Sequence, residues 1–256
     1  MQGQGQGHGQ PHGQRQGTAV VTGASSGIGA ATARALGEAG FDLVLGARRA
    51  DRLAAVAAEV GGRALPLDVT DPESVTAFCS SVPSAAVVVC NAGGALGVEP
   101  VAALDEGHWR TMWETNVLGM ARTVRGLLPA LVASGDGRVV VVTSVAGHQT
   151  YPGGAGYTGA KHAAAAVVDT LRVELLGQPV RVIEVAPGMV ETEFSLVRFD
   201  GDAGRAAGVY AGLTPLTAED VADAVAWAVT RPPHVVAARI DLFPRDQASA
   251  RDTHRG

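Results

Sequence analysis

Three side chains with complementary chemistry follow the apolar run Val139–Val142: the hydroxyl of Ser144, the phenol of Tyr157 and the amine of Lys161. Lys161 is the sole lysine among the 20 Lys and Arg residues of the chain. Arginine cannot give up a proton and presents a planar fork instead of a compact charge, so it cannot substitute where these properties of lysine are used. In a helix, Tyr157 and Lys161 share a face. A phenol beside an ammonium can serve as a general acid or base. The alternative interpretation is that Lys161 is an ordinary solvated lysine on a helix surface.

Short β-branched or apolar runs alternate with Ala-rich helical segments along most of the chain. Continuous apolar strands are typical of a parallel sheet covered on both faces, and strand–helix alternation favours right-handed βαβ units. We therefore expect an α/β, doubly wound fold. The predicted strands are Thr18–Thr22, Leu43–Ala47, Ala64–Leu67, Ala86–Cys90, Val139–Thr143, Val180–Val185 and Val236–Leu242.

Composition predicts one domain over residues 18–247, without a Pro/Ser linker inside it. Residues 1–17 form a Gly/Gln-rich segment that we expect to be disordered, with only a weak metal-binding signal from His8 and His12, and residues 248–256 are expected to be a polar tail. The chain is 46% hydrophobic and 18% charged, enough for a sizeable core.

Charge and cysteine content limit the possible partners and compartment. A net charge of −5 argues against nonspecific nucleic-acid binding. No apolar run reaches the roughly 18 residues that span a bilayer, and no secretory h-region is present. Cys79 and Cys90 lack metal-ligand spacing, so we expect reduced thiols, no metal site and a cytoplasmic, soluble protein.

A glycine-rich turn follows the first predicted strand and opens an Ala-rich helix. Its spacing is G-x-x-x-G-x-G. Glycines at such a turn let the backbone approach a pyrophosphate, which the N–H groups of a helix N-terminus attract. The predicted contacts are Gly23, Ser25, Ser26, Gly27, Ile28 and Gly29. Many strand–helix turns need glycine without binding any phosphate, and this is the alternative.

Arg48 and Arg49 end the second predicted strand, where an acidic residue would bind the 2′-hydroxyl of NAD and an arginine accommodates a 2′-phosphate. Asp51 comes too late to take the acidic role. We therefore predict NADP(H), with Arg48 as the first contact and Arg49 as the second. A solvated charge cluster is the alternative.

Polar residues also end the third and fourth strands, which in a doubly wound sheet open onto the same crevice. They are Asp68 with Val69, and Asn91, Ala92 and Gly93. Each on its own is equally consistent with a turn. Asn116 is an unfavourable mid-helix residue, which indicates a special role. Trp109, Met112 and Trp113 lie at helical spacing and are predicted core residues.

Taken together, these residues resemble the single-domain short-chain dehydrogenase/reductases over about residues 18–247. The resemblance implies a Rossmann-type, seven-stranded parallel sheet with helices on both faces, hydride transfer between NAD(P) and a carbonyl or alcohol, and a homotetramer or homodimer. The motifs that carry it are Thr22-Gly23 with Gly27 and Gly29, Asp68, Asn91-Ala92-Gly93, Asn116, Ser144, Tyr157 with Lys161, and Pro187-Gly188.

The same resemblance implies site roles. Asn116, Ser144, Tyr157 and Lys161 form the catalytic tetrad, in which Tyr157 exchanges a proton, Ser144 holds the substrate oxygen, Lys161 also binds the nicotinamide ribose and Asn116 holds a water. A neighbouring ammonium is expected to favour the tyrosine phenolate. Residues of the turn after the sixth strand would contact the nicotinamide: Pro187, Gly188, Val190 and Thr192. Residues 192–212 would form a substrate lid.

Segments 95–100, 192–202 and 217–236 look like those of NADP-dependent 3-hydroxy acid (allo-threonine/serine) dehydrogenases. A substrate carboxylate favours a bidentate cation, and Arg198 is the candidate, unless it pairs with Asp200 or Asp202. His148 and Tyr151 are expected to line the pocket without an assigned role. A ketoreductase for a larger acyl ketone and a nonenzymatic NADP-sensing protein are the alternatives.

Overall fold

The computed structural model describes residues 16–256. Its seven strands form one parallel sheet in the order β3-β2-β1-β4-β5-β6-β7, which confirms the predicted doubly wound α/β fold. The predictions for residues 1–15, including disorder and the histidines, lie outside the described residues. The strands are β1 (Thr18–Thr22), β2 (Asp42–Ala47), β3 (Arg63–Pro66), β4 (Val87–Cys90), β5 (Gly137–Val142), β6 (Val180–Pro187) and β7 (Arg239–Leu242).

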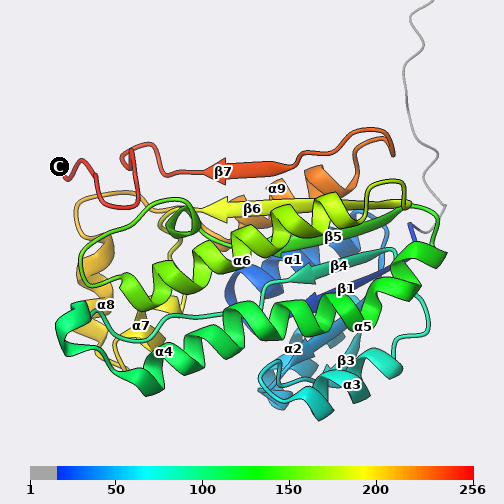
Figure 1. Cartoon of the computed structure of the whole chain (residues 1–256), viewed down its shortest axis with the longest axis horizontal. Helices are drawn as coiled ribbons and strands as arrows, with labels where there is room; N and C mark the ends of the chain where they lie inside the picture. Colours follow the sequence, from blue (N-terminus) through cyan, green and yellow to red (C-terminus); the bar gives the residue numbers. More distant parts are fainter. Residues whose placement is uncertain (1–15) are drawn as a thin grey trace, which may run out of the picture.

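Helices cover both faces of the sheet, because the β-branched residues of the central strands point alternately to either side. In β1, Val21 belongs to one buried cluster and Val20 to the other. Figure 1 shows α5 and α6 in front of the sheet and α1 behind it. The cluster around Val21 includes residues of α1 (Gly27–Glu38), α2 (Ala50–Val60) and α9 (Ala218–Val229). The cluster around Val20 includes residues of α3 (Pro72–Ser80), α5 (Gly119–Ala133) and α6 (Ala155–Glu174).

The last strand is shorter than predicted. β7 begins at Arg239, whereas the expected strand began at Val236, which is 43% exposed. A turn closed by a hydrogen bond from the Val235 N–H to the Pro232 carbonyl keeps the preceding residues out of the sheet. Because β7 is an edge strand with half-exposed residues, the apolar pattern alone does not set its start.

One long helical stretch runs from the carboxyl end of the sheet along its front face (Figure 1). It comprises α4 (Glu106–Trp113), the π-helical segment η2 (Glu114–Leu118) and α5. Met112 is buried as predicted, but the core prediction for Trp113 is wrong, because its side chain is 46% exposed. Trp109 is partly buried and packs against the cluster around Tyr157.

Residues 192–212, the predicted lid, and the C-terminal residues lie at the same end of the sheet. This segment contains α7 (Phe194–Arg198) and α8 (Ala203–Tyr210). The residues expected to be a polar tail make specific contacts there. The Ala250 N–H donates to Gln149 Oε1 at 2.6 Å, and the Gly256 N–H donates to the Gly212 carbonyl at 3.0 Å. Within the described residues, no helix is both long and apolar enough to cross a bilayer.

Candidate active site

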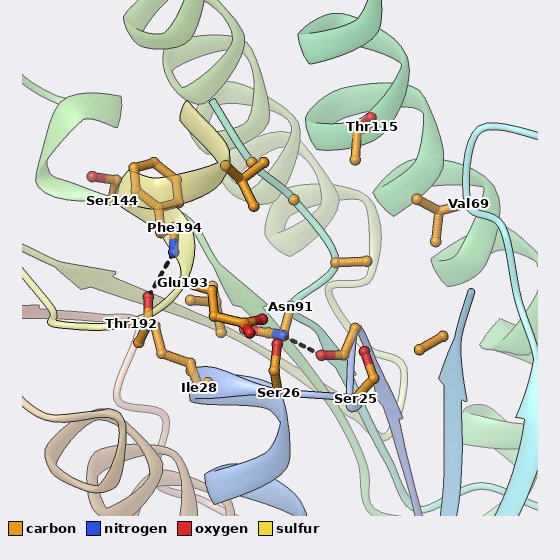
Figure 2. Close-up of a pocket in the computed structure, with 18 of the residues that line it drawn as sticks. Ser25, Ser26, Ile28, Val69, Asn91, Thr115, Ser144, Thr192, Glu193 and Phe194 are labelled. Atoms are coloured by element: carbon orange, nitrogen blue, oxygen red, sulfur yellow. Dashed lines mark hydrogen bonds between the residues drawn. The ribbon is translucent and has the colours of Figure 1, made fainter. Parts of the chain in front are cut away.

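A cavity of about 450 Å³ opens at the carboxyl ends of β1, β2, β4, β5 and β6. Figure 2 shows side chains from the glycine-rich turn, Asn91 and the β6–α7 loop around it. The sequence-predicted residues that line it are Gly23, Ser25, Ser26, Gly27, Ile28, Arg48, Arg49, Asp68, Val69, Asn91, Ala92, Gly93, Ser144, Tyr157, Lys161, Pro187, Gly188, Val190 and Thr192. Three further predicted residues do not line the cavity but contact residues that do: Gly29, Asn116 and Arg198.

The glycine-rich turn is built for close backbone approach. Gly23 has a φ of +67°, in the region that favours glycine. A Cβ at Gly29 would lie 2.3 Å from the Gly23 carbonyl oxygen and 2.5 Å from Asn91 Nδ2. Asn91 Nδ2 donates to the carbonyls of Thr22 and Gly23, at 3.2 and 3.3 Å. The amide of Asn91 therefore fastens the turn to the end of β4 and leaves the N-terminus of α1 open to an anion.

Arg48 and Arg49 lie at one end of the cavity but differ in their contacts. Among the described residues Arg48 makes no hydrogen bond or ion pair, whereas Arg49 contacts Ser25, Ser26 and Glu193, which directly precedes α7. Burial by itself would raise the pKa of Asp68, but hydrogen bonds from Thr70 and the charge of Arg48 bring it below its ordinary value. This end of the cavity is therefore cationic, with a free guanidinium at Arg48.

Ser144, Tyr157 and Lys161 meet at the other end of the cavity. Ser144 follows β5, and Tyr157 and Lys161 share a face of α6. Lys161 Nζ lies 5.8 Å from the centroid of the Tyr157 ring and donates to the Val142 carbonyl at 3.2 Å. Ser144 Oγ lies 3.3 Å from the Pro187 carbonyl oxygen, which it donates to, and it accepts from the Ala146 N–H. The arrangement puts a hydroxyl, a phenol and an amine around one reaction volume.

Burial dominates the proton affinities here. It raises the pKa of Tyr157 above its ordinary value, with a further increase from Tyr151, while Ser144 and Arg198 oppose the shift. Burial likewise lowers the pKa of Lys161 to about 8, and the charge of Glu184 works against that. The expectation that the ammonium favours the tyrosine phenolate considered only the neighbouring charge and missed the larger desolvation effect. Tyr157 is therefore a protonated phenol at neutral pH.

Asn116 sits in the π-helical turn, whose wider hydrogen bonding explains why a poor helix former is tolerated there. Its Nδ2 donates to the carbonyls of Gly94 and Met112, at 2.9 and 2.8 Å, and its Oδ1 accepts from the Gly94 N–H at 3.2 Å. A Cβ at Gly93 would lie 2.7 Å from Asn116 Oδ1. Asn116 therefore holds the loop after β4 against the helix.

Arg198 ends α7 and covers the phenol of Tyr157. Its guanidinium carbon lies 5.5 Å from the Tyr151 ring centroid and 5.8 Å from that of Tyr157. Nε donates to the Gly97 carbonyl at 3.1 Å, while the buried Nη2 has no hydrogen-bond partner among the described residues. Arg198 forms no ion pair there with Asp200 or Asp202, so that alternative is wrong. Asp202 instead caps α8.

His148 does not line the cavity, contrary to expectation. Its Nε2 lies 2.8 Å from Oε1 of the buried Glu184, which also accepts from Thr143. Glu184 is a buried carboxylate within strand β6, and a buried charge is costly without hydrogen-bond partners. The apolar pattern of β6 did not indicate that His148 would be one of these partners. Tyr151 does not line the cavity either; it lies beneath Arg198.

Sequence reasoning also missed several cavity residues, among them Thr115, Glu193 and Phe194. The Phe194 ring packs edge-on to Tyr157, with centroids 5.6 Å apart. The position of Phe194 directly after Thr192-Glu193, at the start of the expected lid, was the available signal.

Burial raises the pKa of the Cys90 thiol to about 12, so this thiol stays neutral. No metal-binding cluster of His, Cys, Asp or Glu occurs in residues 16–256.

The chain is similar to known oxidoreductases in sequence and in structure. A family model described as short chain dehydrogenase matches residues 17–201. An uncharacterized oxidoreductase of Mycobacterium tuberculosis is 58% identical over 92% of this chain and 94% of its own length. An NADP-dependent 3-hydroxy acid dehydrogenase of Schizosaccharomyces pombe is 39% identical over 92% and 95%. The solved closed form of a serine dehydrogenase complexed with NADP⁺ is 35% identical, with a TM-score of 0.88 over 93% of this chain and 100% of that one.

Proposed function

The chain belongs to the short-chain dehydrogenase family and is an NADP-dependent oxidoreductase, and from this premise we propose that it transfers a hydride between NADP(H) and C3 of a small 3-hydroxy or 3-oxo acid. Tyr157 is the general acid of the reduction and the general base of the oxidation. The observation that carries the substrate class concerns Arg198: its buried Nη2 has no hydrogen-bond partner within residues 16–256, and its guanidinium lies against the Tyr157 ring.

The dinucleotide would lie along the cavity from Arg48 to Lys161. Support comes from the close approach of Gly29 to Gly23, which keeps side chains off the turn, and from the free guanidinium of Arg48. The turn would hold the pyrophosphate through backbone N–H groups, and Arg48 would hold the 2′-phosphate. Asp68 and Val69 would contact the adenine half, and the residues from Pro187 to Thr192 the nicotinamide half.

NADPH, when bound, supplies the hydride for reduction. Tyr157 then donates its phenolic proton to the oxygen of the substrate, which Ser144 holds by a hydrogen bond. A buried phenol with a raised pKa is protonated at neutral pH and is ready to donate. Lys161 limits the charge that develops on Tyr157, since its ammonium lies on the same helix face. Asn116 fixes the Gly94 loop beside the reacting groups.

Arg198 would bind the substrate carboxylate. A guanidinium presents several N–H donors in a fixed plane, and a buried donor without a partner costs free energy until an acceptor reaches it. The guanidinium lies against the Tyr151 and Tyr157 rings, so a substrate whose oxygen is held at Tyr157 would bring its carboxylate toward it. The 3-hydroxy acid and serine named for two of the relatives both carry a carboxylate.

The test compares Arg198→Gln with Arg205→Gln, a lid arginine that stacks on Phe199. Arg198→Gln should raise KM for a short 3-hydroxy acid about 10- to 100-fold, as expected for losing a charge-assisted hydrogen bond, and leave KM for its methyl ester unchanged. Arg205→Gln should leave both unchanged. An equal loss on acid and ester, or wild-type preference for large neutral ketones, would favour the larger-ketone reductase instead.

We also propose that the protein works as a homotetramer or homodimer, as its family resemblance implies. Exposed apolar side chains on the described surface, such as Trp113 and Val101, are consistent with an interface. Light scattering of the purified full chain tests this directly. A monomer at working concentration would contradict it.

A further inference from the structure

Glu193 places a negative charge at the mouth of the cavity, directly before α7. Its Oε2 accepts from Arg49 Nη1 at 2.8 Å, and its Oε1 accepts from Arg52 Nη1 at 2.6 Å. Glu193 lies 144 and 141 positions along the chain from the two arginines. Figure 2 labels both Glu193 and Ser26, and Arg49 donates hydrogen bonds to the side chains of both. This ion-pair cluster therefore ties the lid to the β2–α2 loop.

The cluster occupies part of the cationic site on which the 2′-phosphate is expected. Arg49 uses Nη1 for Glu193, Nε for Ser25 Oγ and Nη2 for Ser26 Oγ. Arg48 remains free of hydrogen bonds and ion pairs among residues 16–256. An internal carboxylate thus holds the donors of Arg49 that an incoming phosphate would otherwise take.

We propose that Glu193 is a determinant of cofactor affinity, whose carboxylate competes with the 2′-phosphate of NADP(H) for Arg49 and Arg52. The inference rests on the proposed position of the 2′-phosphate at Arg48 and Arg49. A phosphate monoester carries nearly two negative charges at neutral pH, so it displaces a single carboxylate from a shared arginine. NAD(H) lacks this group and does not compete.

The accessibility and charge of Glu193 fit the role of an exchangeable partner. The side chains of Arg49 and Glu193 are 44% and 42% exposed, so an anion in solution can reach both. Hydrogen bonds from Arg49 and Arg52 lower the pKa of Glu193 to about 2, and the carboxylate stays ionised throughout the neutral range. An exposed ion pair is weak enough to be broken by a better anion.

Displacement of the Glu193 carboxylate from Arg49 would also affect residues at the substrate end of the cavity. Glu193 lies one residue before Phe194, whose ring packs on Tyr157, and Arg198 ends the same short helix. Occupation of Arg49 by the 2′-phosphate would therefore remove one of the two arginine contacts through which Glu193 ties residues 192–212 to the start of α2. The tie that is weakened lies directly before the short helix that carries Phe194 and Arg198.

The experiment measures binding of NADP⁺ and NAD⁺ to the purified full chain by titration calorimetry, for wild type, Glu193→Gln and Glu191→Gln. Glu191 is the matched control, since it is an exposed glutamate of the same loop and is not paired with these arginines. Glu193→Gln should tighten NADP⁺ binding about three- to tenfold and leave NAD⁺ binding unchanged, as expected for removing weak exposed pairs. Glu191→Gln should change neither.

Unchanged or weaker NADP⁺ binding by Glu193→Gln would overturn the inference, as would equal tightening of NADP⁺ and NAD⁺. The proposed cofactor position is tested separately by wild type alone. If wild type prefers NADP⁺ and Glu193→Gln leaves that preference unchanged, competition is refuted while the position stands. If wild type binds both dinucleotides equally, the 2′-phosphate site itself is refuted, and the inference with it.

Discussion

Replacing Lys161 by methionine is expected to stabilise the protein while it abolishes turnover. The Lys161 side chain is buried, and within residues 16–256 its ammonium makes one hydrogen bond, to the neutral Val142 carbonyl. Moving an ammonium out of water is costly when its partners do not replace hydration fully. Methionine has a similar length and no charge, so it removes this cost and keeps a side chain of similar size between α6 and the end of β5.

The magnitude follows from the pKa of Lys161. Burial lowers it from 10.5 to about 8, and each unit corresponds to about 1.36 kcal/mol, so the buried charge costs about 3 kcal/mol near pH 7. Leaving the Val142 carbonyl without its donor costs about 1 kcal/mol. Lys161→Met should therefore raise the free energy of unfolding by about 2 kcal/mol, or Tm by roughly 4–8 °C for a domain of this size.

The stability that Lys161→Met gains over wild type should decrease as the pH rises. The pKa of Lys161 is lower in the folded state than in the unfolded state, so the unfolded chain binds the proton more tightly. The penalty is complete below about pH 8 and disappears as the pH rises toward 10.5. The advantage of Lys161→Met over wild type should thus be largest near neutral pH and close to zero at about pH 9.5.

Urea unfolding of the cofactor-free protein, followed by tryptophan fluorescence at about pH 7 and about pH 9.5, gives both quantities. Activity is measured in parallel and should be lost at each pH. Two results would refute the reasoning. One is a variant less stable than wild type at neutral pH, and the other is an advantage that does not change between the two pH values.

The remaining predictions concern the cofactor half of the cavity. Arg48→Asp should reverse the preference from NADP⁺ toward NAD⁺ in calorimetric titrations, because it replaces the free cation with an acceptor for the ribose 2′-hydroxyl; unchanged selectivity would contradict the assignment. Gly29→Ala should destabilise the protein by about 1–3 kcal/mol in urea and weaken NADP⁺ binding, since its Cβ would meet the Gly23 carbonyl at 2.3 Å. Gly159→Ala is the control: its Cβ meets open space, and it should stabilise α6 by up to about 1 kcal/mol. Similar effects of the two alanines would argue against a crowded turn.

The sequence predicted the elements whose signal is local. A glycine-rich turn after an apolar strand is recognised from a few consecutive residues. The same holds for a tyrosine four positions before a lysine. The doubly wound topology then brings the ends of these strands to one edge, which is why Gly23, Asn91, Ser144 and Tyr157 line one cavity.

What the sequence did not reveal depends on contacts between distant segments or on burial. The pairing of Arg49 with Glu193 joins residues 144 positions apart, and neither residue type indicates the other. The π-helical turn around Asn116, and the side-chain hydrogen bonds from Asn116 to Met112 and Gly94, do not appear in the periodicity of the sequence. The raised pKa of Tyr157 follows mainly from its burial, which is a property of the folded site.

The central claim is that Tyr157 moves the proton of an NADP-dependent hydride transfer. The direct measurement is dihydronicotinamide absorbance with a short 3-hydroxy acid and NADP⁺, for wild type and Tyr157→Phe, with NADPH binding followed by its fluorescence. We predict turnover by wild type, and a loss of at least about 100-fold in Tyr157→Phe with NADPH binding retained. Near-wild-type turnover by Tyr157→Phe would contradict the account.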